Sequence, residues 1–412
     1  MTSLATTTQA TIAAPTSPMF TILTKPGCPW CDDAKKILSD HGLSFKEVSC
    51  PGTLAAELES RGHRVKATTY PVVLRGTDYV GTHDQLKDLL TEPLLKPNGS
   101  RRFTPFPIQH NDMWQMYLKA VASFWTADEV SMADDLADWV KLDEDERHFI
   151  KHVLAFFAGS DGIVMENLNA NFGVEVQVPE ARQFYAYQSF NESIHSQSYG
   201  LMIESLVQSS TERDKLFNAI ETIPAVAKKA AWATKWLDPT RRFAERLVAF
   251  ACVEGILFSG SFCAIFWLKQ RGLMPGLGLF NQFISRDEGL HQDFAAMLYS
   301  DHLVHKLTHS QIETIVREAV DNEKEFIIDA IPCKLIGMNS DLMGEYIEYV
   351  ADRLVVSLGH EAVYGAKNPF KWMELISLSG RTNFFEKVPS EYQKAGVMAK
   401  AEDQIFAIDA DF

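Results

Sequence analysis

The chain has 412 residues, of which 46% are hydrophobic and 23% charged, and its formal net charge at pH 7 is −15. A chain of this length favours two domains, and its composition is that of a soluble globular protein. The acidic balance argues against nucleic acid and anionic membranes as partners.

Residues 1–18, MTSLATTTQATIAAPTSP, form the first segment. The segment is rich in Thr and Ala, contains no Lys or Arg, and lacks the apolar core of a secretion signal. It therefore predicts a disordered tail, and we expect the protein to be cytoplasmic. Six cysteines in so long a chain do not indicate a disulfide framework, which fits a reducing compartment.

Residues 19–92 alternate between strand-like and helix-like patterns, which predicts a small α/β domain. Apolar stretches rich in β-branched residues favour strands, and amphipathic stretches that end near Gly favour helices. The expected strands are 19–24, 45–50 and 70–76, and the expected helices are 32–42, 54–62 and 82–91. Residues 93–107 are dense in Pro, Gly, Ser and Arg, which predicts a linker and docking arm.

A Cys-x-x-Cys motif, KPGCPWC, lies where the first helix of this domain begins. The unpaired N–H groups and the dipole of a helix N-terminus lower a thiol pKa, so Cys28 is expected to be a thiolate nucleophile. A zinc site is the alternative, but Cys50 with His41 or His63 gives poor spacing for the two further ligands. The motif therefore favours redox chemistry.

Together with TTYP and GTHD, this motif resembles the glutaredoxin family over residues 19 to about 92. Thioredoxin, the nearest rival, usually has W-C-G-P-C, which is absent. The resemblance implies a thioredoxin-like fold, with Cys31 as the resolving thiol and a cis bond before Pro71. It also implies a groove for glutathione, formed by Lys25, Cys28, Thr69, Tyr70, Pro71, Gly81, Thr82 and Asp84. The family often has a second Gly where Thr82 stands, which bears on the contacts of Thr82 and His83.

From residue 108 to about 385 the sequence follows a 3.6-residue period, which predicts an all-α domain. The run 247–268 is long enough to cross a membrane, and Glu254 is its only charge. A carboxylate without a partner in lipid is costly, whereas a large helical bundle can supply one, so we expect a buried core helix. Residues 386–412 lack periodicity and predict a mobile tail.

Two E-x-x-H motifs lie in the helical part, within NESIHSQSY and SRDEGLHQD. Their spacing places Glu192, His195 and Tyr199 on one helical face, and Glu288 with His291 on another. A single motif of this kind is most often a solvated Glu and His beside a core residue. A second copy favours one shared site.

Two further acids, Asp161 and Glu254, fall in apolar segments with no Lys or Arg nearby in sequence. Their burial is costly unless each is paired. Two divalent metal ions would balance four carboxylates. One acid from each of two helices plus an E-x-x-H from each of two others is the ligand set of di-metal carboxylate bundles. Oxygen-rich sites with two imidazoles suit iron or manganese. Four protonated or solvated acids are the alternative.

Apolar residues share the ligand faces. Phe258 and Phe262 follow Glu254 by one and two helical turns, and Ile284 lies one turn before the second E-x-x-H. Plain core packing explains such stripes, but the same residues are placed to wall a dry pocket around Tyr199. A phenol one turn beyond a metal ligand is positioned for one-electron oxidation by an oxygen-activated metal pair.

The chain from about 101 to 412 resembles the small, radical-generating subunit of class I ribonucleotide reductase, of the eukaryotic-like type. Besides both E-x-x-H segments, the matching stretches include RRFTPFPI, ASFWTADEV, HVLAFFAGSDGIVMENL, VEGILFSGSF, KLIGMNSDLM, TNFFEKVPSEYQ and the final DADF. The resemblance implies a ferritin-like fold, with Tyr199 as the radical site. The implied ligands of two iron, two manganese or mixed ions, activated by O2, are Asp161, Glu192, His195, Glu254, Glu288 and His291.

The same resemblance implies a relay of oxidising equivalents through Trp125, Asp287 and His195, and through Tyr392 in the tail. The tail, 386–412, would dock to a separate large catalytic subunit, which reduces ribonucleoside diphosphates or triphosphates with its own cysteines. A homodimer is implied as well. Because each reduction leaves a disulfide in that subunit, the front domain is expected to reset it with glutathione.

Two other functions stay open. One is a ferritin-like di-metal oxidase or iron store fused to a redox module, and the other is a binding scaffold with a structural metal site. Storage requires neither Tyr199 in a pocket nor a tail tyrosine. A simple oxidase does not require an acidic tail ending in AIDADF, which is typical of a docking peptide.

Overall fold

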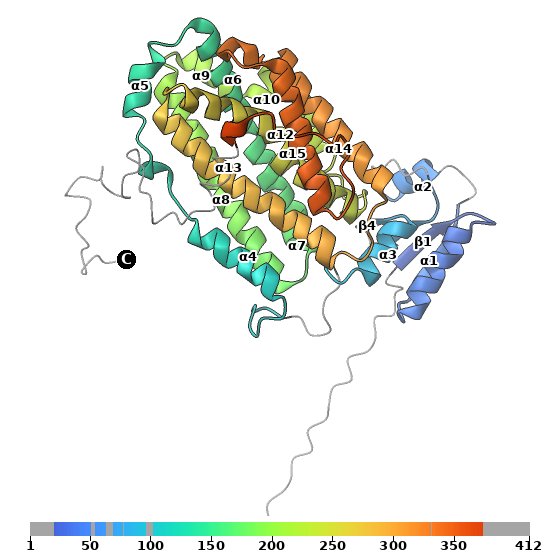
Figure 1. Ribbon diagram of the computed structural model, residues 1–412. Coiled ribbons are helices and arrows are strands. Elements are labelled where there is room, and N and C mark those ends of the chain that lie inside the picture. Colours follow the sequence, from blue (N-terminus) through green and yellow to red (C-terminus); the bar gives the residue numbers. More distant parts are fainter. Residues whose placement is uncertain are drawn as a thin grey trace, which may run out of the picture. The chain divides into compact units, whose positions relative to one another are not determined.

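The computed structural model describes residues 20–50, 54–62, 69–76, 78–95, 102–330 and 332–373. These residues divide into two compact units (Figure 1). The first comprises the chain up to Thr91 together with Thr240–Arg242, and the second comprises the rest. The predicted order of a small α/β domain followed by a large helical domain is confirmed.

The first unit is built on a four-stranded sheet with the order β2-β1-β3-β4. Strands β1 and β2 are parallel, whereas β3 is antiparallel to both β1 and β4. The strands are β1 (Phe20–Thr24), β2 (Phe45–Ser49), β3 (Val72–Arg75) and β4 (Asp78–Gly81). The edge strand β4 was not predicted, because four residues that end in Gly carry almost no strand signal.

Both faces of this sheet are covered, because side chains alternate along each strand. Phe20 and Ile22 pack on one face with residues of α1 (Pro29–Asp40) and α3 (His83–Thr91). Leu23 packs on the other face with Leu58 of α2 (Leu54–Ser60). All three helices were predicted within a few residues of their observed bounds. The arrangement confirms the thioredoxin-like fold.

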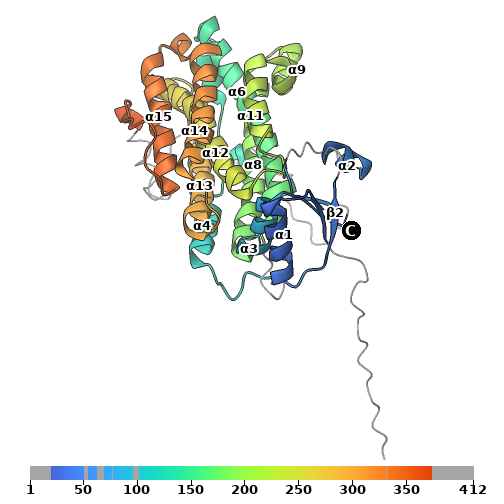
Figure 2. The same ribbon diagram turned by 90° about the vertical axis from the view of Figure 1, so that its right-hand side faces the viewer.

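The second unit is almost entirely helical (Figure 2). Its long helices begin at favourable residues: Pro179 opens α8, and Asp143 caps α6 by accepting the N–H of Glu146 over 2.8 Å. The α-helices are α4 (Asn111–Ala122), α5 (Ala133–Trp139), α6 (Glu144–Asn167), α7 (Gly173–Glu175), α8 (Pro179–Leu206), α9 (Ser210–Phe217), α10 (Ala219–Thr222), α11 (Pro224–Thr234), α12 (Phe243–Gln270), α13 (Pro275–Met297), α14 (His309–Lys324) and α15 (Ser340–Ser357). Short 3₁₀ or π segments are η1 (Ala127–Glu129), η2 (Leu168–Phe172), η3 (Leu298–His302), η4 (Glu325–Ala330) and η5 (Cys333–Ile336).

The apolar run that could cross a membrane lies in α12, at the centre of the helical unit. Among the described residues, α12 is the one helix with the length and hydropathy of a membrane span, and 89% of its most apolar window is buried by the rest of the protein. It packs against α13, α14 and α15. The expected core helix is confirmed.

The division between the units lies between Thr91 and Glu92, just before the segment 93–107 that was predicted as a linker. Leu94 and Leu95, which were expected in the linker, are instead buried in the core of the helical unit. The backbone of Gln177 donates to the carbonyl of Leu94 over 2.8 Å. The apolar side chains thus override the Pro-rich context of this segment. The tails predicted at 1–18 and 386–412, with Tyr392, lie outside the described residues.

Candidate metal centre and thiol site

Four helices of the second unit bring six potential metal ligands together. Each of these six residues is at most 2% exposed. Helices α6 and α12 supply one carboxylate each, and α8 and α13 supply a Glu and a His each, as the spacing predicted. The six are Asp161, Glu192, His195, Glu254, Glu288 and His291.

The ligand atoms form two overlapping groups. Asp161, Glu192 and His195 make one group, and Glu192, Glu254, Glu288 and His291 make the other. Within each group the atoms lie within 4.8 Å of one another, and Glu192 belongs to both. The six residues therefore form one continuous cluster with the ligand composition of di-metal carboxylate bundles.

Glu288 also lies between the two imidazoles. Its Oε1 is 3.0 Å from Nδ1 of His195, and its Oε2 is 3.1 Å from Nδ1 of His291. Burial alone would raise the pKa of Glu288, but hydrogen bonds from both imidazoles lower it. Burial alone would also lower the pKa of His291, yet the charges of Glu192 and Glu288 raise it to about 9. The protein thus draws protons onto its imidazoles to balance the acids.

That balance is incomplete, which fits a pair of metal ions. Burial, followed by the charges of neighbouring carboxylates, raises the pKa values of Asp161 and Glu254. Oδ2 of Asp161 and Oε2 of Glu254 are buried and form no hydrogen bond within the described part of the chain. Buried carboxylate oxygens without donors are destabilising unless a cation faces them. Two divalent ions held by these oxygens and by neutral imidazoles would neutralise the cluster.

A buried glutamine supports one of the ligands. Nε2 of Gln188 donates to Oε1 of Glu254 over 2.7 Å, which fixes that carboxylate with its other oxygen free. Sequence reasoning missed this role. The available signal was helical spacing, since Gln188 lies one turn before Glu192.

The expected relay residues form a connected chain around Asp287. Nε1 of Trp125 donates to Oδ2 of Asp287 over 2.7 Å, and the same oxygen lies 3.3 Å from Nε2 of His195. Arg286 donates to the other oxygen over 3.0 Å. Burial would raise the pKa of Asp287, but the charge of Arg286 and the contact with His195 lower it. Asp287 is therefore held as a carboxylate.

Tyr199 lies in an aromatic pocket next to the ligands. Its ring stacks on Phe157, with ring centres 4.8 Å apart, and Phe157 in turn contacts Phe262 at 5.0 Å and Phe258 at 5.7 Å. Burial, and then the nearby charge of Asp161, raise the pKa of Tyr199 well above its usual value. The phenol thus stays protonated in dry surroundings.

Of two further residues near this pocket, the sequence predicted Ile284 but not Phe157. Ile284 is fully buried in the same core, as expected of that face, although its contact with Tyr199 stays a prediction. Phe157 was not predicted. It lies one helical turn before Asp161, so the reasoning applied to Phe258 would have identified it.

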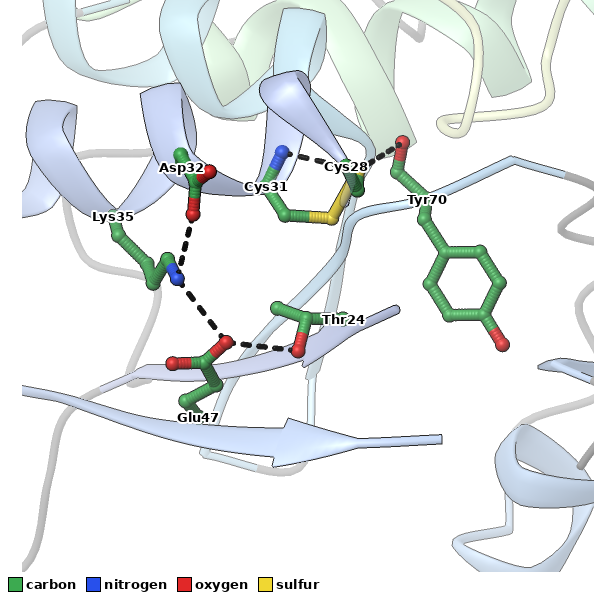
Figure 3. The surroundings of a disulfide bond; sticks show 7 residues. All are labelled: Thr24, Cys28, Cys31, Asp32, Lys35, Glu47 and Tyr70. Carbon is green, nitrogen blue, oxygen red and sulfur yellow. Dashed lines mark hydrogen bonds and ion pairs between the residues drawn. A yellow bond between two sulfur atoms is a disulfide. The ribbon is translucent and has the colours of Figure 1, made fainter. Parts of the chain in front are cut away.

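Two cysteines of the first unit, Cys28 and Cys31, lie at the start of α1 and form a disulfide (Figure 3). Cys28 is the residue that caps α1, and its Sγ accepts the N–H of Cys31 over 3.2 Å. Pro29 occupies the first turn. Such an N–H donor favours a thiolate at Cys28 once the disulfide is reduced.

The loop opposite the disulfide carries three of the residues expected to bind glutathione, Thr69, Tyr70 and Pro71. The Tyr70–Pro71 bond is cis, as predicted, and the carbonyl of Tyr70 is 3.9 Å from Sγ of Cys28. Nζ of Lys25 lies 5.6 Å from the centre of the Tyr70 ring. Thr69 is exposed beside them. A cation and an aromatic face next to a reactive sulfur suit an anionic thiol peptide.

The GTHD segment uses its side chains at the start of α3. The backbone N–H of Thr82 donates to Oε1 of Gln85 over 3.0 Å, and its hydroxyl donates to the same atom. Gly81 has a φ of +130°, which favours Gly, and Gln85 packs against it. His83 is buried and contacts the carboxylates of Asp33 and Asp84 at 2.7 and 2.8 Å. Thr82 and His83 thus bind protein groups.

Comparison with known proteins gives two family matches on this chain. Residues 102–369 match the family described as ribonucleotide reductase, small chain, and residues 20–80 match glutaredoxin. The chain is 59% identical over 325 residues to the ribonucleoside-diphosphate reductase small chain of Nicotiana tabacum, covering 78% of this chain and 98% of that protein. It is 56% identical to the small chain of Trypanosoma brucei brucei, covering 78% and 95%.

Solved structures agree on the fold of the helical unit. The ribonucleotide reductase Rnr4 homodimer of Saccharomyces cerevisiae aligns with a TM-score of 0.66 at 38% identity, covering 73% of this chain and 96% of that one. Dimanganese(II)-NrdF of Streptococcus sanguinis aligns with a TM-score of 0.56 at 17% identity, covering 66% and 96%, a likeness of fold alone.

Proposed function

The chain belongs to the ribonucleotide reductase small-chain family and carries a glutaredoxin domain in front of it, and on that premise we propose that it makes a tyrosyl radical at Tyr199 and resets its catalytic partner through Cys28 and Cys31. The overall reaction converts ribonucleotides to deoxyribonucleotides together with a large subunit. The observation that carries the proposal is the cluster of six buried ligands with Tyr199 in a dry aromatic pocket beside it.

The protein's own residues prepare the phenol for oxidation. When bound, two iron, two manganese or mixed ions would use O2 to supply the one-electron oxidation of Tyr199. Asp161, Glu192, His195, Glu254, Glu288 and His291 would hold them. The Phe157 ring, stacked on Tyr199 and backed by Phe258 and Phe262, excludes water and small reductants that would quench a radical.

Delivery of the oxidising equivalent would use the hydrogen-bonded chain of Trp125, Asp287 and His195. The carboxylate of Asp287 accepts from both rings, so a proton can shift along the chain as an electron moves. Beyond it, Tyr392 and the tail 386–412 would continue the path and dock to the large subunit. We also expect a homodimer and a cytoplasmic protein.

The front domain would supply electrons through thiol exchange. The Cys28 thiolate attacks one sulfur of the large-subunit disulfide, forms a mixed disulfide, and releases the other sulfur, which takes a proton. Cys31 then attacks Sγ of Cys28, which releases the second thiol and leaves the Cys28–Cys31 disulfide. Two glutathione molecules reduce this bond and leave as glutathione disulfide. Lys25, Tyr70 and Thr69 would bind glutathione during that last step.

Electron paramagnetic resonance with metal analysis tests the radical proposal. After loading with Fe²⁺ or Mn²⁺ and exposure to O2, the wild type should hold two ions per chain and give a tyrosyl signal that a radical scavenger removes. Tyr199→Phe should keep the metal and lose the signal. Tyr185→Phe is the matched control, because Tyr185 is a second buried tyrosine of α8. Metal uptake well beyond two ions without a tyrosyl signal would favour an iron store instead.

Cys28→Ser tests the reductase proposal on the full chain. The variant should form the radical normally and support turnover with a small dithiol, yet stall with glutathione when no other glutaredoxin is present. Cys50→Ser, which removes a buried free thiol of the same unit, is the control and should retain glutathione-driven turnover. Wild-type turnover of Cys28→Ser with glutathione would assign the fused domain another role.

A further inference from the structure

A second group of potential metal ligands lies at the surface of the helical unit, outside the buried centre. His110 directly precedes α4, Asp112 lies in its first turn, and His302 ends η3. The ligand atoms of these three side chains lie within 4.8 Å of one another. Two imidazoles and a carboxylate from segments 190 residues apart in sequence thus converge on one point.

Each of the three side chains is oriented for this point by local structure. Oδ1 of Asp112 accepts the N–H of Met113 over 2.9 Å, which turns Oδ2 toward Nε2 of His302 at 2.5 Å. His110 stands at the cap position of α4, but its side chain makes no capping hydrogen bond. Its ring instead meets the ring of His302 edge to face, with centres 5.4 Å apart. A simple surface ion pair accounts for Asp112 and His302 but gives no reason for the second imidazole.

From this geometry we propose that His110, Asp112 and His302 bind one divalent transition-metal ion, with Zn²⁺ as the best fit. Two imidazole nitrogens and one carboxylate oxygen leave a fourth, open position for water in a tetrahedral site. The two nitrogens favour Zn²⁺, Cu²⁺ or Ni²⁺ over Mg²⁺ and Ca²⁺, which prefer oxygen ligands. The half-buried imidazoles at an open surface also let the ion exchange with solvent.

The position of the site gives the ion a structural consequence. Helix α4 runs from His110 to the turn that carries Trp125, and η3 continues α13, the helix of Glu288 and His291. Helix α4 also packs against α13 (Figures 1 and 2). An ion bound there would link the start of α4, which leads to Trp125, to the end of α13, which carries Glu288 and His291. Because it binds only the folded chain, it would raise thermal stability.

Zinc binding to the full-length protein, with its buried centre loaded with iron beforehand, tests the proposal. Equilibrium dialysis should find one zinc ion per chain beyond the iron, and zinc should raise the melting temperature. His110→Ala, Asp112→Asn and His302→Ala should each weaken this binding by about tenfold or more and abolish the rise. His309→Ala is the matched control, since His309 faces another histidine, His360, at 5.8 Å but belongs to no ligand group among the described residues.

Copper gives a readout that stability effects cannot mimic. With Cu²⁺ as the probe, the paramagnetic resonance spectrum should show coupling to two imidazole nitrogens in the wild type and His309→Ala, and to one in His110→Ala. The proposal is overturned if no extra zinc binds at stoichiometric concentration, or if all three variants bind it as tightly as the control does.

Discussion

The indole nitrogen of Trp125 donates to Oδ2 of Asp287 over 2.7 Å, and that same oxygen lies 3.3 Å from Nε2 of His195. Because a carboxylate only accepts, Nε2 of His195 must carry a proton, which leaves Nδ1 directed at Glu192 and Glu288. Asp287 therefore sets the tautomer of a metal ligand and also anchors the tryptophan. The two roles can be separated by substitution.

Trp125→Phe should stop nucleotide reduction while leaving the metal centre intact. The substitution removes the N–H donor and the readily oxidised indole but keeps Asp287 in place for His195. Asp287→Ala should in addition weaken metal binding by about 10–100-fold, since His195 loses its orienting partner. Metal content, radical yield and turnover are measured for both variants. Equal metal loss in Trp125→Phe would mean that the indole supports the site itself.

Gln188→Leu should weaken metal binding by about 10–100-fold, because Glu254 loses the 2.7 Å hydrogen bond that orients it. The apolar replacement keeps the volume of a fully buried side chain. Gln197→Leu on the exposed face of α8 is the control and should bind metal normally. Titration with Fe²⁺ or Mn²⁺ under anaerobic conditions measures both affinities. Unchanged binding in Gln188→Leu would leave Glu254 positioned by α12 alone.

The four helices that carry the metal ligands and most of the metal centre could be predicted, because their sequence signals are local. Ligands that recur at three- and four-residue spacings define a helical face. The position of Cys28 at a helix start favours its thiolate form, because the N-terminus of a helix stabilises negative charge. The sheet was predicted except for β4, a short edge strand. Gln188 and Phe157 were missed because glutamine and phenylalanine at helical spacing occur in any core.

Helical spacing cannot predict contacts between segments that are far apart in the sequence. Trp125 and Asp287 are 162 residues apart, and only resemblance to a family placed them in one relay. The meeting of Asp112 with His302 had no counterpart in the sequence reasoning. Leu94 and Leu95 were assigned to a linker from composition, although their burial depends on the helices against which they pack. Composition describes a segment, whereas burial depends on its neighbours.

Lys229→Met should destabilise the helical unit by about 3–5 kcal/mol. Lys229 is fully buried and lies 2.5 Å from Glu323, whose other oxygen accepts the N–H of Gly260 in α12. Removal of the lysine leaves the buried carboxyl of Glu323 and the carbonyl of Leu257 without their hydrogen-bond donor. Lys228→Met, which breaks an exposed pair with Glu325, should cost less than about 1 kcal/mol. Chemical unfolding of both variants measures the difference, and equal costs would contradict the role of burial.

The same lysine should make stability depend on alkaline pH. Burial lowers the pKa of Lys229 from 10.5 to about 8, and the charge of Glu323 offsets this only in part. The folded chain therefore loses the proton before the unfolded chain does as pH rises. As pH rises from about 8 to 10.5, the unfolding free energy should therefore increase, by up to about 3 kcal/mol from this group. Unfolding of wild type and Lys229→Met across this range isolates the contribution, which a parallel pH dependence in both proteins would disprove.

Cys31→Ser should split the activity of the front domain. Cys28 can still attack a mixed disulfide between a small thiol and glutathione, because that exchange needs only one thiolate. The small thiol is released, and a second glutathione then frees Cys28 from the bound glutathione. Reduction of the large-subunit disulfide should stall, since no second thiol is left to release the captured protein from Cys28. Both rates are measured on the full chain, with a glutathionylated peptide and with the oxidised large subunit as substrates.

The N–H of Cys31 that faces Sγ of Cys28 belongs to the backbone, so the serine keeps this donor and the reactivity of Cys28 should be preserved. Loss of both activities would show that Cys31 also tunes the nucleophile, and retention of both would show that glutathione alone can release the large subunit.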